Sequence, residues 1–114
     1  MMMSDNLIYY HASHRQHAVG TVLVPDMAET PAVGDFHWRT DRVWLAIDRQ
    51  EAEEWGQIIA LTRNVSEVFL YRVQPLARVY LSLDSSTDLR QASTSKAHVL
   101  ELITLLPRLS PPVQ

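Results

Sequence analysis

The sequence predicts an α+β fold, with several short strands around one main helix. Runs of β-branched, aromatic and other apolar residues recur along the chain and end at turn-forming residues. Only residues 50–63 combine a helix-capping signal with apolar residues at helical spacing. At 114 residues, 46% of them hydrophobic, the chain can bury one modest core. We therefore expect a single domain over residues 1–114, with loose ends at 1–6 and 107–114.

Three strands are expected in the first half of the chain. The first is an aromatic and β-branched run at 7–10, which leaves the sheet as a loop over 11–14. A second run at 21–24 is stopped by a proline, and a third lies at 43–47. Residues 26–38 hold a proline, a glycine and acidic residues. We expect them to form a long surface loop, of a length that often carries function.

The helix expected at 50–63 has a signal at each end. Asp48 is the expected N-cap, because its carboxylate can accept hydrogen bonds from the unpaired N–H groups of the first turn. Glu51, three residues later, completes a capping-box spacing. Asn64 suits the C-cap, because asparagine tolerates the left-handed conformation there.

The second half of the chain predicts two strands with alternating apolar residues, at 67–73 and 77–83, which form a hairpin. Residues 84–95 are polar and predict a loop, with or without a short helix at 88–92. Residues 97–106 fit a helix or a buried strand equally well, because a dense apolar run satisfies both periodicities.

Composition argues against several classes of function. The 10 basic and 13 acidic residues give a net charge of −3, which disfavours nucleic-acid binding. The absence of cysteine excludes disulfides and a thiolate nucleophile. There is no apolar run of about 18 residues that would predict a membrane span. The N-terminus lacks the features of a signal peptide, so we expect a cytoplasmic protein. Lys96 is the only lysine, and arginine suits bidentate contacts with anions.

Three histidines, His11, His14 and His17, recur at a spacing that would share one face of a helix, as in some metal sites. No acid or fourth ligand follows at a telling spacing, and a histidine-rich loop is the alternative. We predict no metal ion. The three glycines form neither a phosphate-binding loop nor a dinucleotide fingerprint.

The aromatic residues are more suggestive of function. Most must belong to the core of so small a domain, but one or two could line a slot for a planar ring. A dinucleotide could be bound by three side chains from separate elements. These are a histidine at one strand end, an aromatic residue at a second strand end and an acid after a later hairpin. The histidine would bond a ribose hydroxyl, the aromatic would stack on nicotinamide, and the acid would stabilise an oxocarbenium-like centre. Scattered core residues are the alternative.

Four stretches, in order along residues 7–84, resemble the rifamycin ADP-ribosyltransferases. Tyr10-His11-Ala12-Ser13 resembles the opening Tyr-His-Gly-Thr of that family, and residues 19–25 resemble its Gly-Asp-Leu-Ile-x-Pro strand. Val43-Trp44-Leu45-Ala46 resembles Val-Tyr-Phe-Thr. Ala52-Glu53-Glu54-Trp55-Gly56 resembles the Ala-x-x-Trp-Gly of the helix that follows. Residues 68–75 resemble Ile-Tyr-x-Val-x-Pro.

The resemblance implies two packed, mostly antiparallel sheets with one main helix around an NAD-binding cleft, and a strand at 97–106. The residues that would bind NAD come from three segments of the chain. They are His11, Ala12, Ser13, Trp44 and Trp55. His11 takes the place of the ribose-binding histidine, and Trp44 that of the stacking tyrosine.

The resemblance also supplies an acid. Asp84 corresponds to the catalytic acid after the hairpin, with Asp88 as the fallback. Ser93 or Ser95 corresponds to a polar residue before the last strand.

The implied activity is NAD-dependent mono-ADP-ribosyl transfer, with His11 and Asp84 as the catalytic residues. This glycosyltransferase reaction releases nicotinamide from NAD and passes ADP-ribose to an acceptor, a small molecule or a protein, that the sequence does not identify. Because Trp44 replaces a tyrosine, the alternative is a non-catalytic interaction protein of the same fold, such as an antitoxin-like, phage or regulatory partner.

Overall fold

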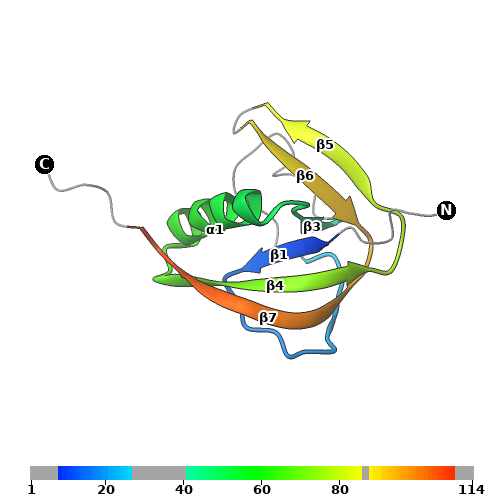
Figure 1. Cartoon of the computed structure of the whole chain (residues 1–114), viewed down its shortest axis with the longest axis horizontal. Helices are drawn as coiled ribbons and strands as arrows, with labels where there is room; N and C mark the ends of the chain where they lie inside the picture. Colours follow the sequence, from blue (N-terminus) through cyan, green and yellow to red (C-terminus); the bar gives the residue numbers. More distant parts are fainter. Residues whose placement is uncertain (1–7, 27–40, 86–87, 110–114) are drawn as a thin grey trace, which may run out of the picture.

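A computed structural model describes residues 8–26, 41–85 and 88–109 of the chain. Within these residues the fold is α+β, as the sequence predicts, and it has one helix and the two antiparallel sheets that the resemblance implies. The elements in chain order are β1 (Tyr9–Ser13), β2 (Val22–Leu23), β3 (Val43–Leu45), α1 (Arg49–Arg63), β4 (Glu67–Pro75), β5 (Tyr80–Asp84), β6 (Leu89–Thr94) and β7 (Ala97–Pro107). One sheet has the strand order β1-β4-β7-β2, and the other β3-β6-β5. In Figure 1, α1 lies along β1 and β4, and the β5–β6 hairpin rises beside it.

The two faces of β4 bury two different cores. Val68 and Leu70 pack against α1, where Trp55 belongs to the same cluster. Tyr71 and Val73 point to the opposite face and join a cluster with residues of β3 and β6. The alternation predicted for this strand is therefore confirmed. The four-stranded sheet packs against the helix on one face and against the three-stranded sheet on the other.

The helix begins and ends where its caps predict. The Asp48 carboxylate accepts from the backbone N–H of Gln50 at 2.7 Å and of Glu51 at 3.3 Å. Asn64 takes the left-handed conformation at the other end, with φ 54° and ψ 52°. The Glu51 carboxylate, however, binds Arg90 of β6, so its main contact lies outside the predicted capping box.

Gly56 lets α1 approach the sheet closely. A Cβ atom at this position would lie 2.7 Å from Cδ1 of Leu106 in β7, closer than carbon atoms pack. The glycine of the Ala-x-x-Trp-Gly stretch is therefore required by packing against β7, and its φ is not in the positive range.

The hairpin predicted from 67–73 and 77–83 is wrong. β4 pairs with β1 and β7, whereas β5 belongs to the other sheet and pairs with β6. The loop predicted at 84–95 is also wrong, since residues 89–94 form β6 in the centre of the three-stranded sheet. These residues have weak intrinsic β propensity, and pairing with a strand on each side stabilises them instead.

Other boundaries differ from the predictions in smaller ways. β1 covers residues 9–13, so three of the four residues predicted to leave the sheet as a loop, 11–13, remain paired with β4. Residues 97–107 form a strand, as the resemblance implies. Residues 108–109 hydrogen bond to Ser66 and Gln57, so this part of the predicted loose tail is held. Most of the loop predicted at 26–38, residues 1–7 and residues 110–114 lie outside the described residues. In the described part of the chain, no helix is long and apolar enough to cross a membrane.

Candidate functional site

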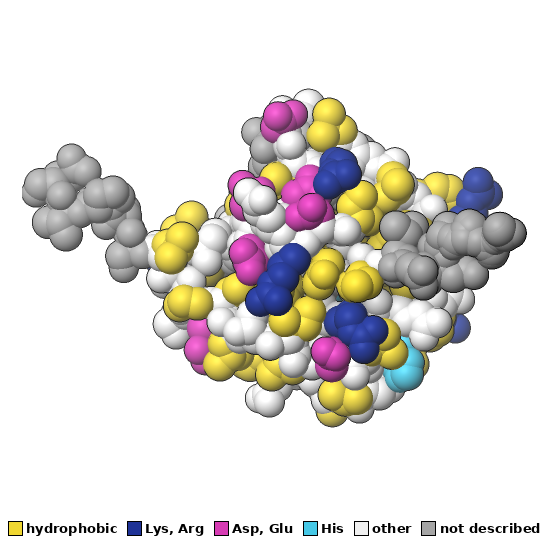
Figure 2. All heavy atoms as spheres, viewed as in Figure 1, with side chains coloured by type: hydrophobic (Ala, Val, Ile, Leu, Met, Phe, Trp, Pro, Cys, Tyr) yellow, Lys and Arg dark blue, Asp and Glu magenta, His cyan; other side chains and the backbone are white. Residues whose placement is uncertain are grey.

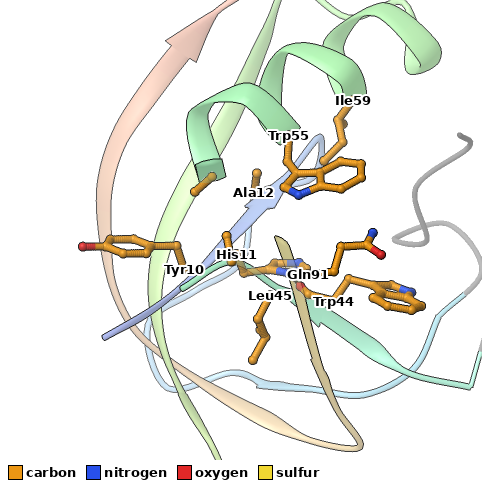
Figure 3. A pocket seen from close by; sticks show the side chains of 10 residues that line it. Tyr10, His11, Ala12, Trp44, Leu45, Trp55, Ile59 and Gln91 are labelled. Carbon is orange, nitrogen blue, oxygen red and sulfur yellow. Dashed lines mark hydrogen bonds between the residues drawn. The ribbon is translucent and has the colours of Figure 1, made fainter. Parts of the chain in front are cut away.

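One cavity collects side chains from β1, β3, α1 and β6. Its walls include His11, Ala12, Trp44, Trp55 and Gln91. Four of the five residues expected to bind NAD therefore line a single cavity, although they span residues 11 to 55 of the sequence. Figure 3 shows the two indole rings on either side of the Gln91 amide, one from α1 and one from β3.

His11 is held in one orientation by the neighbouring sheet. Its side chain is 3% exposed, and Nδ1 lies 2.7 Å from the carbonyl oxygen of Trp44. Because a carbonyl can only accept, Nδ1 carries the proton in this contact. In the neutral ring, Nε2 then carries the lone pair. The contact is possible because paired backbone N–H and C=O groups of Tyr10 and Ala46, at 2.8 Å, join the two sheets.

Trp55 combines a structural contact with a place in the cavity wall. It is 6% exposed and belongs to the core between α1 and β4. Its indole Nε1 donates to the backbone carbonyl of Arg90 at 3.4 Å. The Glu51 carboxylate accepts from both the backbone N–H and the guanidinium of Arg90, and it raises the pKa of that guanidinium. The helix is thus joined to β6 at the residue next to Gln91.

Gln91 is a polar residue of this cavity that the sequence did not suggest. It is 4% exposed, and its Oε1 atom is buried with no hydrogen-bond partner. A buried amide oxygen without a donor is costly, so its presence in a cavity wall indicates a polar ligand or water there. No sequence signal marks Gln91, because it lies in a run of residues that predicts a loop.

Ser13 lies apart from the cavity that holds the other expected residues. It is fully buried, and its Oγ atom accepts from the backbone N–H of Arg15 at 2.9 Å. In this position Ser13 fixes the chain where it leaves β1.

The two candidate acids lie at the end of the β5–β6 hairpin. The backbone of Asp84 is paired with Leu89, two positions from the pair of Ser82 and Gln91. Two strand positions correspond to roughly 7 Å, so Asp84 is the acid whose backbone lies nearer the cavity. Asp88 is exposed in the turn, with φ 60°.

The two candidate serines differ in their surroundings. Ser93 is 8% exposed in β6, opposite Trp44 of β3, and its Oγ atom accepts from Nε of Arg42 at 3.2 Å. Ser95 is exposed beyond the end of the strand. Ser93 therefore belongs to the side of the sheet that carries Trp44 and Gln91.

The cavity is small, and a second one shares a wall with it. The first has a volume of about 30 Å³. One water needs roughly 10–15 Å³, so the cavity has room for about two waters. The second, of about 170 Å³, is lined by His11 together with Arg15, His17 and Arg42. His11 therefore lies in the wall between a small aromatic cavity and a larger one of mixed polar and apolar lining.

The histidines do not form a metal site among the residues that the structure describes. Within these residues, no three His, Cys, Asp or Glu side chains are placed to hold a metal ion. The rings of His11 and His17 lie 6.3 Å apart between centroids, and the hydroxyl of Tyr71 accepts from the backbone N–H of His17 at 2.6 Å.

Compared with models of known protein families and with curated proteins, the chain matches neither a family nor an individual protein.

Proposed function

We propose that this protein is an NAD-dependent ADP-ribosyltransferase with an ADP-ribosyltransferase-like fold. One observation carries the proposal: residues assigned to NAD from the sequence, on β1, β3 and α1, line one cavity. Their meeting does not follow from hydrophobic patterning alone. It also brings a histidine that is fixed by a hydrogen bond next to two indole rings.

Each side chain then has a role in the reaction. Nicotinamide stacks on Trp44, and its amide hydrogen bonds to Gln91, whose buried oxygen has no other partner. Nε2 of His11 accepts a hydrogen bond from a ribose hydroxyl, while Nδ1 keeps its hydrogen bond to the Trp44 carbonyl. Asp84 stabilises the positive charge that develops on the nicotinamide ribose.

The transfer itself exchanges one bond for another. The bond between the ribose C1′ and the nicotinamide nitrogen breaks, and nicotinamide leaves with the bonding electron pair. The acceptor nucleophile forms a new bond to C1′ and loses a proton to solvent or a base. The protein contributes positioning and charge stabilisation, and the acceptor is a small molecule or a protein.

A non-catalytic interaction protein is the second candidate function, and the small cavity favours it. A volume of about 30 Å³ does not admit a nicotinamide ring without side-chain movement. Under this alternative, His11 and both indoles are core residues, and the protein acts through its surface.

Incubation with NAD distinguishes the two candidates. The enzyme releases nicotinamide, measured by chromatography, and calorimetry detects NAD binding. We expect Trp44→Ala to lose both signals and Trp44→Phe to keep binding, because an aromatic face remains. If the folded wild-type protein neither turns over nor binds NAD, the proposal that it is an enzyme is disproved. Full activity in Trp44→Ala would disprove only the assignment of Trp44 as the stacking residue.

A further inference from the structure

Two arginines on the three-stranded sheet share one aromatic ring. The guanidinium carbon of Arg42 lies 4.9 Å from the ring centroid of Tyr80, and that of Arg78 lies 5.0 Å from the same centroid. Tyr80 is 51% exposed, so solutes can reach this arrangement. Two like charges held this close repel one another, unless an anion compensates them.

Four other arginines of the described residues are paired with carboxylates. These pairs are Arg15 with Asp26, Arg49 with Glu53, Arg72 with Glu101 and Arg90 with Glu51. Within the described residues, Arg42 and Arg78 form no ion pair. Two uncompensated guanidinium groups therefore meet at one ring.

Arg42 also has an unused hydrogen-bond donor. Its Nε atom donates to Ser93, but Nη2 is buried and has no acceptor. A buried N–H group without an acceptor costs free energy, and a charged one costs more. An anion that bonded to this guanidinium would supply the missing acceptor.

The arginine pair lies on the same side of the sheet as the aromatic cavity. Ser93 of β6 is directly opposite Trp44 of β3 and also directly opposite Tyr80 of β5. Directly opposite residues of antiparallel strands project to the same face. Trp44 and Tyr80 are therefore two strand spacings apart, or about 10 Å. One ligand can reach both positions if it carries a ring at one end and an anion at the other.

We propose that Arg42, Tyr80 and Arg78 form a phosphate-binding subsite for the ligand whose ring enters the Trp44 cavity. This inference rests on the proposed function and adds the residues that select a phosphorylated ligand. A phosphate fits better than a single carboxylate, because its several oxygens can accept from two guanidinium groups together. The charge is local: on the face shown in Figure 2, basic and acidic side chains are interspersed, without a continuous basic track.

Calorimetry with two ligands that differ by one phosphate tests the subsite. Nicotinamide riboside has no phosphate, and nicotinamide mononucleotide has one. We expect the wild-type protein to bind the mononucleotide at least about tenfold more tightly, because charge-assisted bonds to phosphate are among the strongest polar contacts. Arg78→Gln should weaken binding of the mononucleotide and leave that of the riboside unchanged. Arg72→Gln, which removes an equal charge from the other sheet, should change neither.

If both nicotinamide ligands bind, equal affinities of the wild-type protein for them would overturn the subsite. So would a phosphate preference that persists in the Arg42→Gln/Arg78→Gln double variant. Arg78 is exposed, and within the described residues its side chain contacts the Tyr80 ring and forms no ion pair, so its variant should fold even if substitution of Arg42 disturbs the sheet.

Pyrophosphate separates this proposal from the proposed function. Nuclear magnetic resonance should show shifts of the Arg42 and Arg78 Nε–H signals when pyrophosphate is added, and the double variant should show no pyrophosphate response. If neither nicotinamide ligand binds but these shifts occur, the phosphate subsite stands and the NAD assignment fails. If neither nicotinamide ligand binds and the shifts are absent, the subsite fails as well.

Discussion

The carboxylate of Glu51 holds both the backbone and the side chain of Arg90. Its oxygens accept from the Arg90 backbone N–H at 2.9 Å and from the guanidinium at 2.8 and 2.9 Å. This contact joins the first turn of α1 to β6, the strand that carries Gln91. The geometry of the cavity therefore depends on a residue that does not line it.

Loss of this contact should destabilise the fold. We expect Glu51→Ala to lower the thermal midpoint of unfolding, since the Arg90 N–H loses its acceptor. Glu53→Ala is the matched control on the same helix. It removes only an exposed pair with Arg49, of a kind that contributes about 0.3–0.5 kcal/mol. Equal effects of the two substitutions, measured by circular dichroism, would contradict this role for Glu51.

Gln91 should contribute to ligand binding at the expense of stability. In Gln91→Met, a side chain of similar size removes a buried oxygen that has no partner. We expect the free energy of unfolding to rise by about 1 kcal/mol, since an unsatisfied buried polar group costs about 1–3 kcal/mol. Nicotinamide binding should weaken in the same variant. Urea unfolding and calorimetry measure the two effects, and a loss of stability would show that the amide has a structural partner.

Gly56→Ala should be destabilising, although alanine is the better helix former. Alanine gains about 1 kcal/mol in an unhindered helix. Here its Cβ meets Leu106 at 2.7 Å, and overpacking costs about 1–3 kcal/mol. The double variant Gly56→Ala/Leu106→Val should recover part of the loss, because it removes the clashing methyl group. A Gly56→Ala protein more stable than the wild type in urea would show that Leu106 moves aside freely.

Asp48→Ala should test the cap that starts α1. The carboxylate accepts from two backbone N–H groups of the first turn, and loss of such a cap costs about 0.5–2 kcal/mol. Asp48→Asn keeps an acceptor and should retain most of this stability. Chemical unfolding measures the stability of the two variants. Equal losses in the free energy of unfolding for Asp48→Ala and Asp48→Asn would contradict the capping role.

Local chemistry predicted the helix well. Asp48 and Asn64 mark its ends because caps involve residues a few positions apart. The alternation of Val68 and Leu70 against Tyr71 and Val73 was also readable, because each face of β4 buries its own core. Such signals need no knowledge of the rest of the chain.

The strand pairing could not be predicted in the same way. The turn after β4 carries the chain from one sheet to the other, where Leu76 donates to the carbonyl of Lys96 at 2.9 Å. β6 forms because a strand pairs with it on each side, and residues 89–94 themselves carry no sequence signal for a strand. Gln91 was missed for the same reason: a residue in an apparent loop gives no reason to expect a buried amide.

The site residues lie between these two cases. The resemblance indicated His11, Ala12, Trp44 and Trp55, and the fold brings them to one cavity. Spacing along the sequence alone would not have predicted that these residues meet. The backbone bridge between Tyr10 and Ala46, which joins the two sheets, leaves no local sequence signal.

The volume of the first cavity has a kinetic consequence. With about 30 Å³ available, the free protein is nearly closed to a planar ring, so an indole or the Gln91 amide must swing aside before a ligand can enter. Association should then be slower than the typical 10⁵–10⁷ M⁻¹s⁻¹. In stopped-flow fluorescence, the observed rate should level off at high ligand concentration, at the frequency with which the tryptophan wall opens.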